Sequence, residues 1–168
     1  MSDLKTNNVR GYLAEFMVAH AVGAVAPRVE WDSWDVTSPD GVRIEVKTSG
    51  YIQAWAQKKL SVPTFRVAPA YGWEASTGAW SGQQSLNAHV YVFCLHTATS
   101  HDTYDPLDTS QWKFYIASRT AVEERTTRQM GLATLRKVAG DPVTYGELGA
   151  AIAGRVEQED SAGTAHAG

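Results

Sequence analysis

Residues 29–49, VEWDSWDVTSPDGVRIEVKTS, are the stretch that decides the fold. Residues 42–49 alternate strictly between apolar or β-branched side chains and polar ones, which is typical of a β-strand with two unlike faces. Residues 29–38 are rich in Trp, Val and Thr and predict a second strand. The intervening Ser38-Pro39-Asp40-Gly41 suits a type I turn followed by a left-handed glycine. The whole stretch therefore predicts a β-hairpin.

The turn determines which residues of the two strands face each other. A three-residue loop pairs Ser38 with Val42 and therefore places Asp35 opposite Glu45. Two carboxylates opposite each other on one sheet face repel, which costs stability unless positive charge lies between them. Lys47 lies on the same face two residues beyond Glu45 and supplies one positive charge. A divalent cation would supply the remaining positive charge.

The ligand chemistry of this pair indicates which cation to expect. Carboxylate oxygens without His or Cys nearby favour Mg²⁺ or Mn²⁺ over Zn²⁺. A bound ion of this kind supports the attack of water on a phosphodiester, with Lys47 orienting the nucleophile and stabilising the charged transition state. The hairpin thus predicts a metal-dependent hydrolytic site.

Asp35 followed by Glu45-Val46-Lys47 resembles the PD-(D/E)XK superfamily of restriction-endonuclease-like nucleases. In that pattern an Asp on one strand precedes an acidic-x-Lys triplet on the next, and a Glu often lies on a preceding helix, where Glu15 is found here. The resemblance covers residues 7–67, with looser agreement of strand order to residue 117. It implies that Asp35 and Glu45 are metal ligands, that Lys47 is the catalytic lysine, and that Glu15 is an auxiliary ligand or a supporting group.

Alternatives to these assignments remain open. The literal Pro-Asp dipeptide ends in Asp40, but the hairpin tip is four residues along the strand from Glu45, about 13 Å at the rise of a strand. Asp32 is a rival for Asp35, although its parity places it on the other face. Glu15 could instead neutralise a buried arginine or cap a loop amide. A strand of this composition is also typical of an ordinary solvated sheet face.

Residues around the triplet are candidates for substrate binding. Family members often carry a further polar residue just beyond the lysine, for which Ser49 and Gln53 are the candidates here. Basic side chains could form a phosphate-binding strip, namely Arg43, Lys58, Lys59 and Arg66. Three tryptophans, Trp55, Trp73 and Trp80, could stack on bases, although packing in the core or in loops is the commoner fate of tryptophan.

The rest of the chain predicts helices around a sheet. We expect a helix over residues 9–24, capped by Asn7 or Asn8, apolar on nearly every side and hence buried, with Leu13, Phe16, Met17 and Ala21 on one face. Further strands are expected at 64–67, at 89–96 as a central strand containing a buried Cys94, and at 112–117, with a long loop or small insertion over 71–87. Thr144 and Glu147 form a capping box before a C-terminal helix.

These elements predict an α/β (α+β) fold with a restriction-endonuclease-like three-layer α/β/α core around a central mixed β-sheet. Residues 1–156 are expected to form one nuclease-like domain, and residues 157–168 a disordered tail. The polar loop with His101, Asp102, Asp105 and Asp108 is expected to be solvated rather than to bind metal.

Composition limits the remaining choices. A formal net charge of −3 and a pI near 5.9 argue against a protein that coats nucleic acid through bulk positive charge, yet residues 1–66 carry 8 basic and 7 acidic side chains, a net of +1. The single Cys excludes a disulfide framework and favours a cytoplasmic protein. No segment reads as a signal peptide or a membrane span.

The function expected from the sequence is a Mg²⁺- or Mn²⁺-dependent endonuclease that acts on DNA, with no membrane partner and with a homodimer or partner subunit as a further expectation. One alternative is a catalytically inactive nuclease-fold module that binds nucleic acid or a protein. Another is a nuclease directed at RNA or at DNA junctions.

Overall fold

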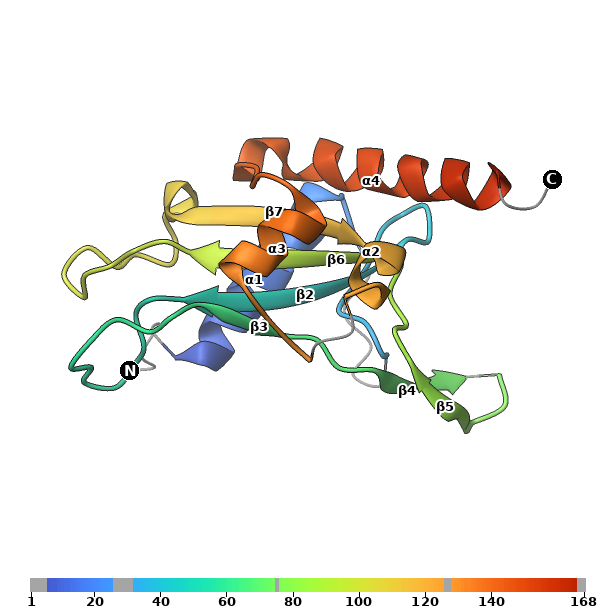
Figure 1. The fold of residues 1–168 in the computed structure, drawn as a ribbon, viewed down its shortest axis with the longest axis horizontal. Coiled ribbons are helices and arrows are strands. Elements are labelled where there is room, and N and C mark those ends of the chain that lie inside the picture. The colour runs from blue at the N-terminus through green and yellow to red at the C-terminus, as the bar shows by residue number, and fades with distance from the viewer. Residues whose placement is uncertain (1–5, 26–31, 75, 126–127, 166–168) are drawn as a thin grey trace.

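A four-stranded mixed sheet forms the centre of the protein, as Figure 1 shows in a computed structural model that describes residues 6–25, 32–74, 76–125 and 128–165. Strand β1 (Val36–Thr37) is antiparallel to β2 (Arg43–Gly50), which is parallel to β6 (Val90–His96), and β6 is antiparallel to β7 (Trp112–Ser118). The prediction of an α+β protein with a central mixed sheet is confirmed.

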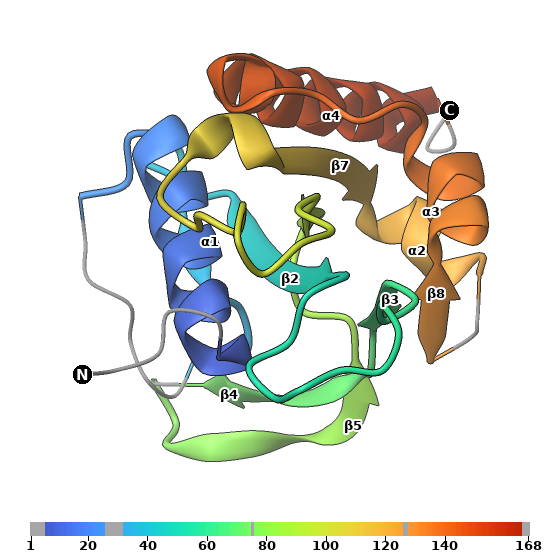
Figure 2. The same cartoon turned by 90° about the vertical axis from the view of Figure 1, so that its left-hand side faces the viewer.

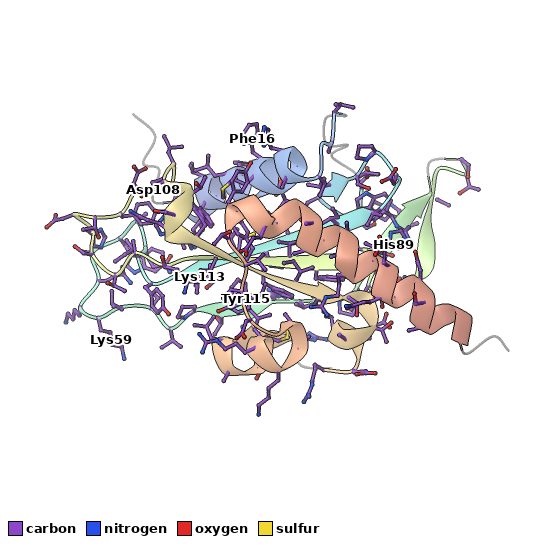
Figure 3. All side chains as sticks on the ribbon, turned by 90° about the horizontal axis from the view of Figure 1, so that it is seen from above. Phe16, Lys59, His89, Asp108, Lys113 and Tyr115 are labelled. Atoms are coloured by element: carbon purple, nitrogen blue, oxygen red, sulfur yellow. The ribbon has the colours of Figure 1, made fainter. Side chains whose placement is uncertain are left out.

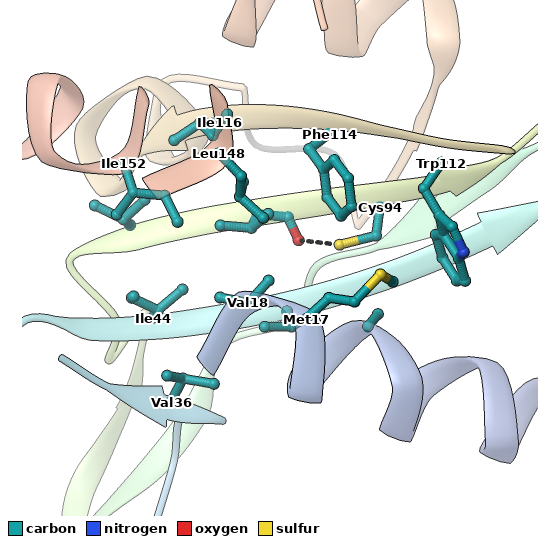
Figure 4. Packing of buried hydrophobic residues seen from close by; sticks show 14 residues of the cluster. Met17, Val18, Val36, Ile44, Cys94, Trp112, Phe114, Ile116, Leu148 and Ile152 are labelled. Carbon is teal, nitrogen blue, oxygen red and sulfur yellow. Dashed lines mark hydrogen bonds between the residues drawn. The ribbon is translucent and has the colours of Figure 1, made fainter. Parts of the chain in front are cut away.

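Helices cover both faces of this sheet (Figure 2). On one face lie α1 (Asn7–Ala21) and α4 (Tyr145–Ala165), which pack on Ile44, Val92 and Phe114. Figure 4 shows this apolar cluster, with Met17 and Val18 of α1 on one side and Leu148 and Ile152 of α4 on the other. The other face is covered by α2 (Arg119–Glu123), α3 (Leu132–Ala139) and a small sheet of β3 (Thr64–Arg66) with β8 (Gln129–Gly131).

The predicted hairpin and its register are confirmed. Val36 pairs with Ile44 and Thr37 with Arg43, and the N–H of Ser38 donates to the carbonyl of Val42 at 2.9 Å. Gly41 has φ +83°, the left-handed conformation that the turn requires. Residues 33–35 form a bend, so the regular strand begins only at Val36. The predicted strand positions 29–31 lie outside the described residues.

Helix α1 differs from the expectation of a helix buried all round. Its cap is Thr6, whose hydroxyl accepts the N–H of Val9 at 3.3 Å, rather than Asn7 or Asn8. The sheet covers one side of α1, so Phe16 is 68% exposed and lies on the outer side of the helix (Figure 3). The predicted face is therefore wrong at Phe16, whereas Met17 is buried and Ala21 packs against the core as predicted; Arg10, Ala14 and Val18 are buried as well.

Other segments also differ from the predictions. The expected long loop over 71–87 contains a second hairpin, β4 (Ala70–Glu74) with β5 (Ala79–Ser85), which projects from the body of the protein in Figure 1. Its turn is possible because Gly78 adopts φ +63°. The strand predicted at 64–67 exists as β3, but it pairs with β8 outside the central sheet.

The C-terminal helix is longer than predicted. Its capping box is confirmed, since the N–H and hydroxyl of Thr144 both donate to Glu147 Oε2 at 2.8 Å. Residues 157–165, predicted to be disordered, continue α4 to Ala165, because the first half of the helix is held against β7 and propagation of a helix costs little once it is nucleated. Among the helices of the described residues, none is long and apolar enough to cross a bilayer.

Strand β6 matches its prediction closely. All seven of its residues are buried, as expected for a strand covered on both faces, and Cys94 is fully buried within it. A short 3₁₀ helix, η1 (Thr109–Gln111), leads into the neighbouring strand β7. Strand β2 is thus held between the edge strand β1 and a fully buried neighbour.

Candidate active site

The two faces of β2 carry different kinds of side chain. Ile44 and Val46 point into the apolar cluster beneath α1 and are buried. Glu45 and Lys47 point to the other face, where the parallel register places them beside Tyr91 and Phe93 of β6. This division follows from the two-residue period of a strand.

Glu45 and Lys47 form an ion pair at the surface of the sheet. Lys47 Nζ donates to Glu45 Oε1 at 2.5 Å, and the two side chains keep 29% and 18% of their surface exposed, respectively. Both groups are therefore within reach of solvent while their backbone is fixed in the sheet. Lys47 therefore lies on the same face as Glu45, as the alternation of the strand predicted.

Asp35 lies at the edge of β2, directly before β1. Its N–H donates to the carbonyl of Ile44 at 3.0 Å, and its Oδ2 accepts the N–H of Val46 at 2.8 Å. The regular ladder of β1 ends at Val36, so the expected cross-strand pairing of Asp35 with Glu45 is replaced by this side-chain bond to the residue after Glu45. The Asp35 carboxylate is thereby held against the backbone of the strand that carries Glu45 and Lys47.

The charges of the two carboxylates act on different buried groups. Burial, and after it the charge of Glu45, raises the pKa of Tyr91 on one face. Burial, and after it the charge of Asp35, raises the pKa of the Cys94 thiol on the other face. Burial is the larger cause of both shifts, and both Tyr91 and Cys94 remain protonated at neutral pH.

Glu15 lies in a different layer of the fold from Glu45 and Lys47. It lies on α1, whose neighbours Ala14 and Val18 pack on the apolar face of β2, whereas Glu45 points to the opposite face. Among the described residues, no three His, Cys, Asp or Glu side chains lie close enough to one another to hold a metal ion. A set of two carboxylates completed by water and phosphate oxygens is nevertheless a usual environment for Mg²⁺, so Asp35 and Glu45 fit that ion chemically.

The predicted substrate-binding residues are spread along β2 and the loop that follows it. Ser49 is buried, and its hydroxyl accepts the N–H of Thr64, which ties β2 to β3. Gln53 is also buried and donates weakly to the carbonyl of Gly50 at 3.4 Å. Lys58 and Lys59 are exposed in the loop.

Arg43 lies at the opposite end of β2 from these residues. Its guanidinium lies 5.0 Å from the ring centroid of Trp34, and its backbone N–H donates to His89 Nδ1 at 3.0 Å. Burial, followed by the charges of Arg43 and Arg119, lowers the pKa of His89, so the imidazole is neutral and can accept that bond. The five predicted substrate residues are therefore not gathered in one place.

A buried polar group that the sequence did not predict lies where β2 ends. Arg10 is 3% exposed; its Nη1 donates to the carbonyl of Ile52 at 3.0 Å and its Nη2 to Asn7 Oδ1 at 2.5 Å. Burial lowers the pKa of Arg10, an effect that Tyr104 partly opposes. Arg10 thus fixes the start of α1 to the chain leaving β2.

His96 completes this group from β6. It pairs with Gly50 across the sheet, and its ring centroid lies 4.3 Å from that of Tyr104, with the two ring planes tilted by 36°. Burial lowers the pKa of His96, so the side chain is neutral. A signal for this group was present in Gly50, since a Cβ there would lie 3.1 Å from Arg10 Nη1 and 3.3 Å from the His96 carbonyl oxygen. Only the three-dimensional structure shows which residues need that space.

A pocket of about 760 Å³ lies elsewhere, beneath the second half of α4. Asp40, His89, Arg119 and Glu159 line it, and the Glu159 side chain accepts the N–H of Thr120 there. Neither Glu45 nor Lys47 is among its lining residues. The described pocket is therefore separate from the Glu45–Lys47 pair.

Comparison with known proteins identifies a family. The family model described as bacteriophage T4 endonuclease IV matches residues 1–132, a span that contains the whole central sheet and Asp35, Glu45 and Lys47, and that ends where α3 begins. Among curated proteins, none matches the chain. Because the matched span covers most of the sequence, the chain belongs to the bacteriophage T4 endonuclease IV family.

Proposed function

We propose that this protein is a Mg²⁺-dependent endonuclease of the PD-(D/E)XK type that hydrolyses phosphodiester bonds in DNA. Membership of a family described as an endonuclease supports the reaction class. The observation that carries the assignment of the site is the partly exposed Glu45–Lys47 pair on β2, with the Asp35 carboxylate bonded to the backbone N–H of Val46. Mn²⁺ would serve in place of Mg²⁺.

Asp35 and Glu45 are the proposed metal-holding groups. Both belong to or border β2, whose pairing with the buried strand β6 limits their movement. Mg²⁺, when bound, would polarise a phosphoryl oxygen and lower the pKa of a coordinated water. Glu15, on the helix that covers the other face, has at most a supporting role in this arrangement.

Lys47 is the proposed catalytic lysine. Its ammonium group has three N–H donors, of which one is used by Glu45 Oε1 at 2.5 Å. The remaining donors would orient the attacking water or a phosphoryl oxygen, and the positive charge would stabilise the extra negative charge of the transition state. The pairing with Glu45 keeps this ammonium group on the substrate side of the sheet.

Cleavage of plasmid DNA and oligonucleotides with Mg²⁺ or Mn²⁺ tests the proposal. The wild type is expected to cut, and Lys47→Ala and Asp35→Ala are expected to be inactive, while Asp40→Ala, a change in the exposed turn, keeps wild-type activity. If Asp40→Ala is the inactive variant instead, the metal ligand has been assigned to the wrong aspartate. If Lys47→Ala and Asp35→Ala cut like the wild type, the mechanism proposed here is wrong.

Calorimetry, together with the cleavage assay, tests the alternative of an inactive binding module. Such a module would release no Mn²⁺ binding heat that depends on Asp35 and Glu45, and would not cut either substrate. Calorimetry of the wild type, Asp35→Ala and Glu45→Ala therefore separates a working metal site from a nuclease fold that only binds. An RNA oligonucleotide in the same series distinguishes a DNA enzyme from an RNA enzyme.

A further inference from the structure

The loop between β2 and β3 is organised by one side chain. Gln57 Oε1 accepts the N–H of Gln53 at 2.8 Å, and Gln57 Nε2 donates to the Tyr51 carbonyl and to Ser61 Oγ, both at 3.1 Å. The loop is closed at its base by the N–H of Ser61, which donates to the carbonyl of Tyr51 at 3.0 Å. Residues 51–61 therefore form a compact loop with its own internal bonds, of the kind that often carries function; we call it the arm.

The arm exposes a large aromatic side chain. Trp55 is 59% exposed, and its neighbours Ala54 and Ala56 are exposed as well. Leaving an indole in water forgoes the burial that normally stabilises a tryptophan in a fold. A loop held this firmly around an exposed tryptophan indicates a contact with something outside the chain.

The charge of the arm indicates what that partner is. Lys58 and Lys59 are exposed, and Figure 3 shows Lys59 at the outer end of the protein. Between Glu45 and Glu74 the charged residues of the sequence are all basic, namely Lys47, Lys58, Lys59 and Arg66. This run of positive charge, beginning at the candidate site and continuing into the arm, complements a polyanion.

Trp80 provides an internal comparison. It lies on β5 and is 56% exposed, close to the value for Trp55. The sequence from Val67 to Gln111 contains no Lys or Arg, so Trp80 differs from Trp55 in having no basic residue near it in the sequence. The arm, in contrast, carries the exposed Trp55 three residues before the exposed Lys58 and Lys59.

We propose that the arm is a nucleic-acid contact, in which Lys58 and Lys59 bind phosphates and Trp55 packs on an exposed base or sugar face. Gln57 is a positioning residue that acts through these three side chains. The proposal rests on the proposed function in one respect: the nucleic-acid strand that the arm binds is the strand that is cleaved at Glu45 and Lys47. It concerns binding, so it can be tested apart from cleavage.

Binding is measured by fluorescence anisotropy in the Lys47→Ala background without divalent ion, with a labelled DNA oligonucleotide offered as a single strand and as a duplex. Trp55→Ala is expected to weaken binding of at least one form about tenfold. Lys58→Ala and Lys59→Ala each reduce the slope of log affinity against log salt by about 1. The matched controls Trp80→Ala and Lys137→Ala, an exposed lysine on α3, leave both quantities unchanged.

A double-mutant comparison tests the role of Gln57. Gln57→Ala weakens binding as much as Trp55→Ala when the arm is intact, and has no further effect when Trp55, Lys58 and Lys59 are already alanine. Gln57→Glu keeps the acceptor for the Gln53 N–H and loses the donors, so it gives a smaller loss. Equal losses from Gln57→Ala in both backgrounds would show a general structural effect and overturn its positioning role.

The two proposals fail in different ways. If Trp55→Ala and the lysine variants bind both DNA forms like the Trp80→Ala and Lys137→Ala controls, or if the parent protein binds neither form, the arm proposal is overturned. If the arm variants lose affinity while the wild type never cuts DNA in Mg²⁺ or Mn²⁺, the proposed function fails and the arm remains a binding element.

Discussion

The two faces of strand β2 differ sharply although they share one backbone. Ile44 and Val46 are buried against α1, whereas Glu45 and Lys47 form a partly exposed ion pair on the opposite face. The buried apolar residues hold the strand in place, and the charged residues are the proposed catalytic groups. Each proposed catalytic group is therefore next in sequence to a residue that is fixed in the core. Substitutions on the two faces should therefore change different measured quantities.

The largest expected effect is on the charged face. Lys47→Ala should reduce the cleavage rate by about 10²–10³-fold, because a positive group close to the transition state is lost. The unfolding midpoint should change less than the rate, because Lys47 and Glu45 keep 29% and 18% of their side-chain surface exposed and water can still reach the carboxylate that is left. Steady-state cleavage and thermal unfolding of the same preparation check this, and a large drop in stability without loss of rate would remove the distinction between the faces.

On the apolar face the opposite outcome is expected. Ile44→Ala should lower the free energy of unfolding by about 2–5 kcal/mol, since Ile44 is fully buried among α1, β1 and β6. The cleavage rate per folded molecule should stay near the wild-type value. Val62→Ala is a control, because Val62 is 82% exposed and its loss should change stability by less than about 0.5 kcal/mol. Denaturant unfolding measures both variants.

The end of β2 tests how tightly the strand is joined to its surroundings. Gly50→Ala should destabilise the protein by about 1–3 kcal/mol, because the new Cβ would meet Arg10 Nη1 at 3.1 Å and the His96 carbonyl oxygen at 3.3 Å. Gly11→Ala on α1 is the matched control. Its Cβ would meet nothing within 4 Å, and alanine is the better helix former by about 0.5–1 kcal/mol, so stability should rise. A stability loss for Gly11→Ala equal to that for Gly50→Ala would show that the space around Arg10 is not the cause.

The smallest effect concerns α4, which covers the apolar face. The N–H and then the hydroxyl of Thr144 lower the pKa of Glu147 from its ordinary value of 4.5. Because the folded pKa is the lower one, the stabilisation is present above pH 4.5 and is lost as the pH falls through the folded value. As the pH is lowered from 5, the thermal unfolding midpoint of Glu147→Gln should therefore fall less than that of the wild type. Identical pH curves for the two proteins would contradict this.

Short-range features of the fold could be predicted from the sequence. The hairpin register follows from the turn at Pro39, Asp40 and Gly41, and the capping box follows from Thr144 and Glu147 three residues apart. The continuous apolar run of β6 predicted a strand buried on both faces. In each case the deciding interactions lie within a few residues of one another.

Features that depend on distant partners could not be predicted in this way. The pairing of β3 with β8 joins segments about sixty residues apart, and tertiary contacts of this kind override local propensity. Phe16 matched an apolar helix face, but the sheet covers a different side of α1. Arg10 and His96 come together only because α1 and β6 meet at the end of β2.

The same distinction between local and distant interactions explains why only part of the candidate site could be predicted. Glu45 and Lys47 are neighbours on one strand face, so alternation alone brings them together. The position of Asp35 depends on its carboxylate accepting the N–H of Val46 in place of a backbone carbonyl. The alternation of side chains along a strand does not predict such a bond. Glu15 belongs to another layer, and its relation to the site depends on how α1 docks.

The most direct test of the central claim is a crystal of the protein soaked in Mn²⁺ and measured at a wavelength where manganese scatters anomalously. We expect an anomalous peak between Asp35 and Glu45, at about 2.0–2.3 Å from a carboxylate oxygen of each, and its loss in Asp35→Ala crystals. Anomalous density that lies elsewhere, or a peak that survives Asp35→Ala unchanged, would contradict the proposed metal site.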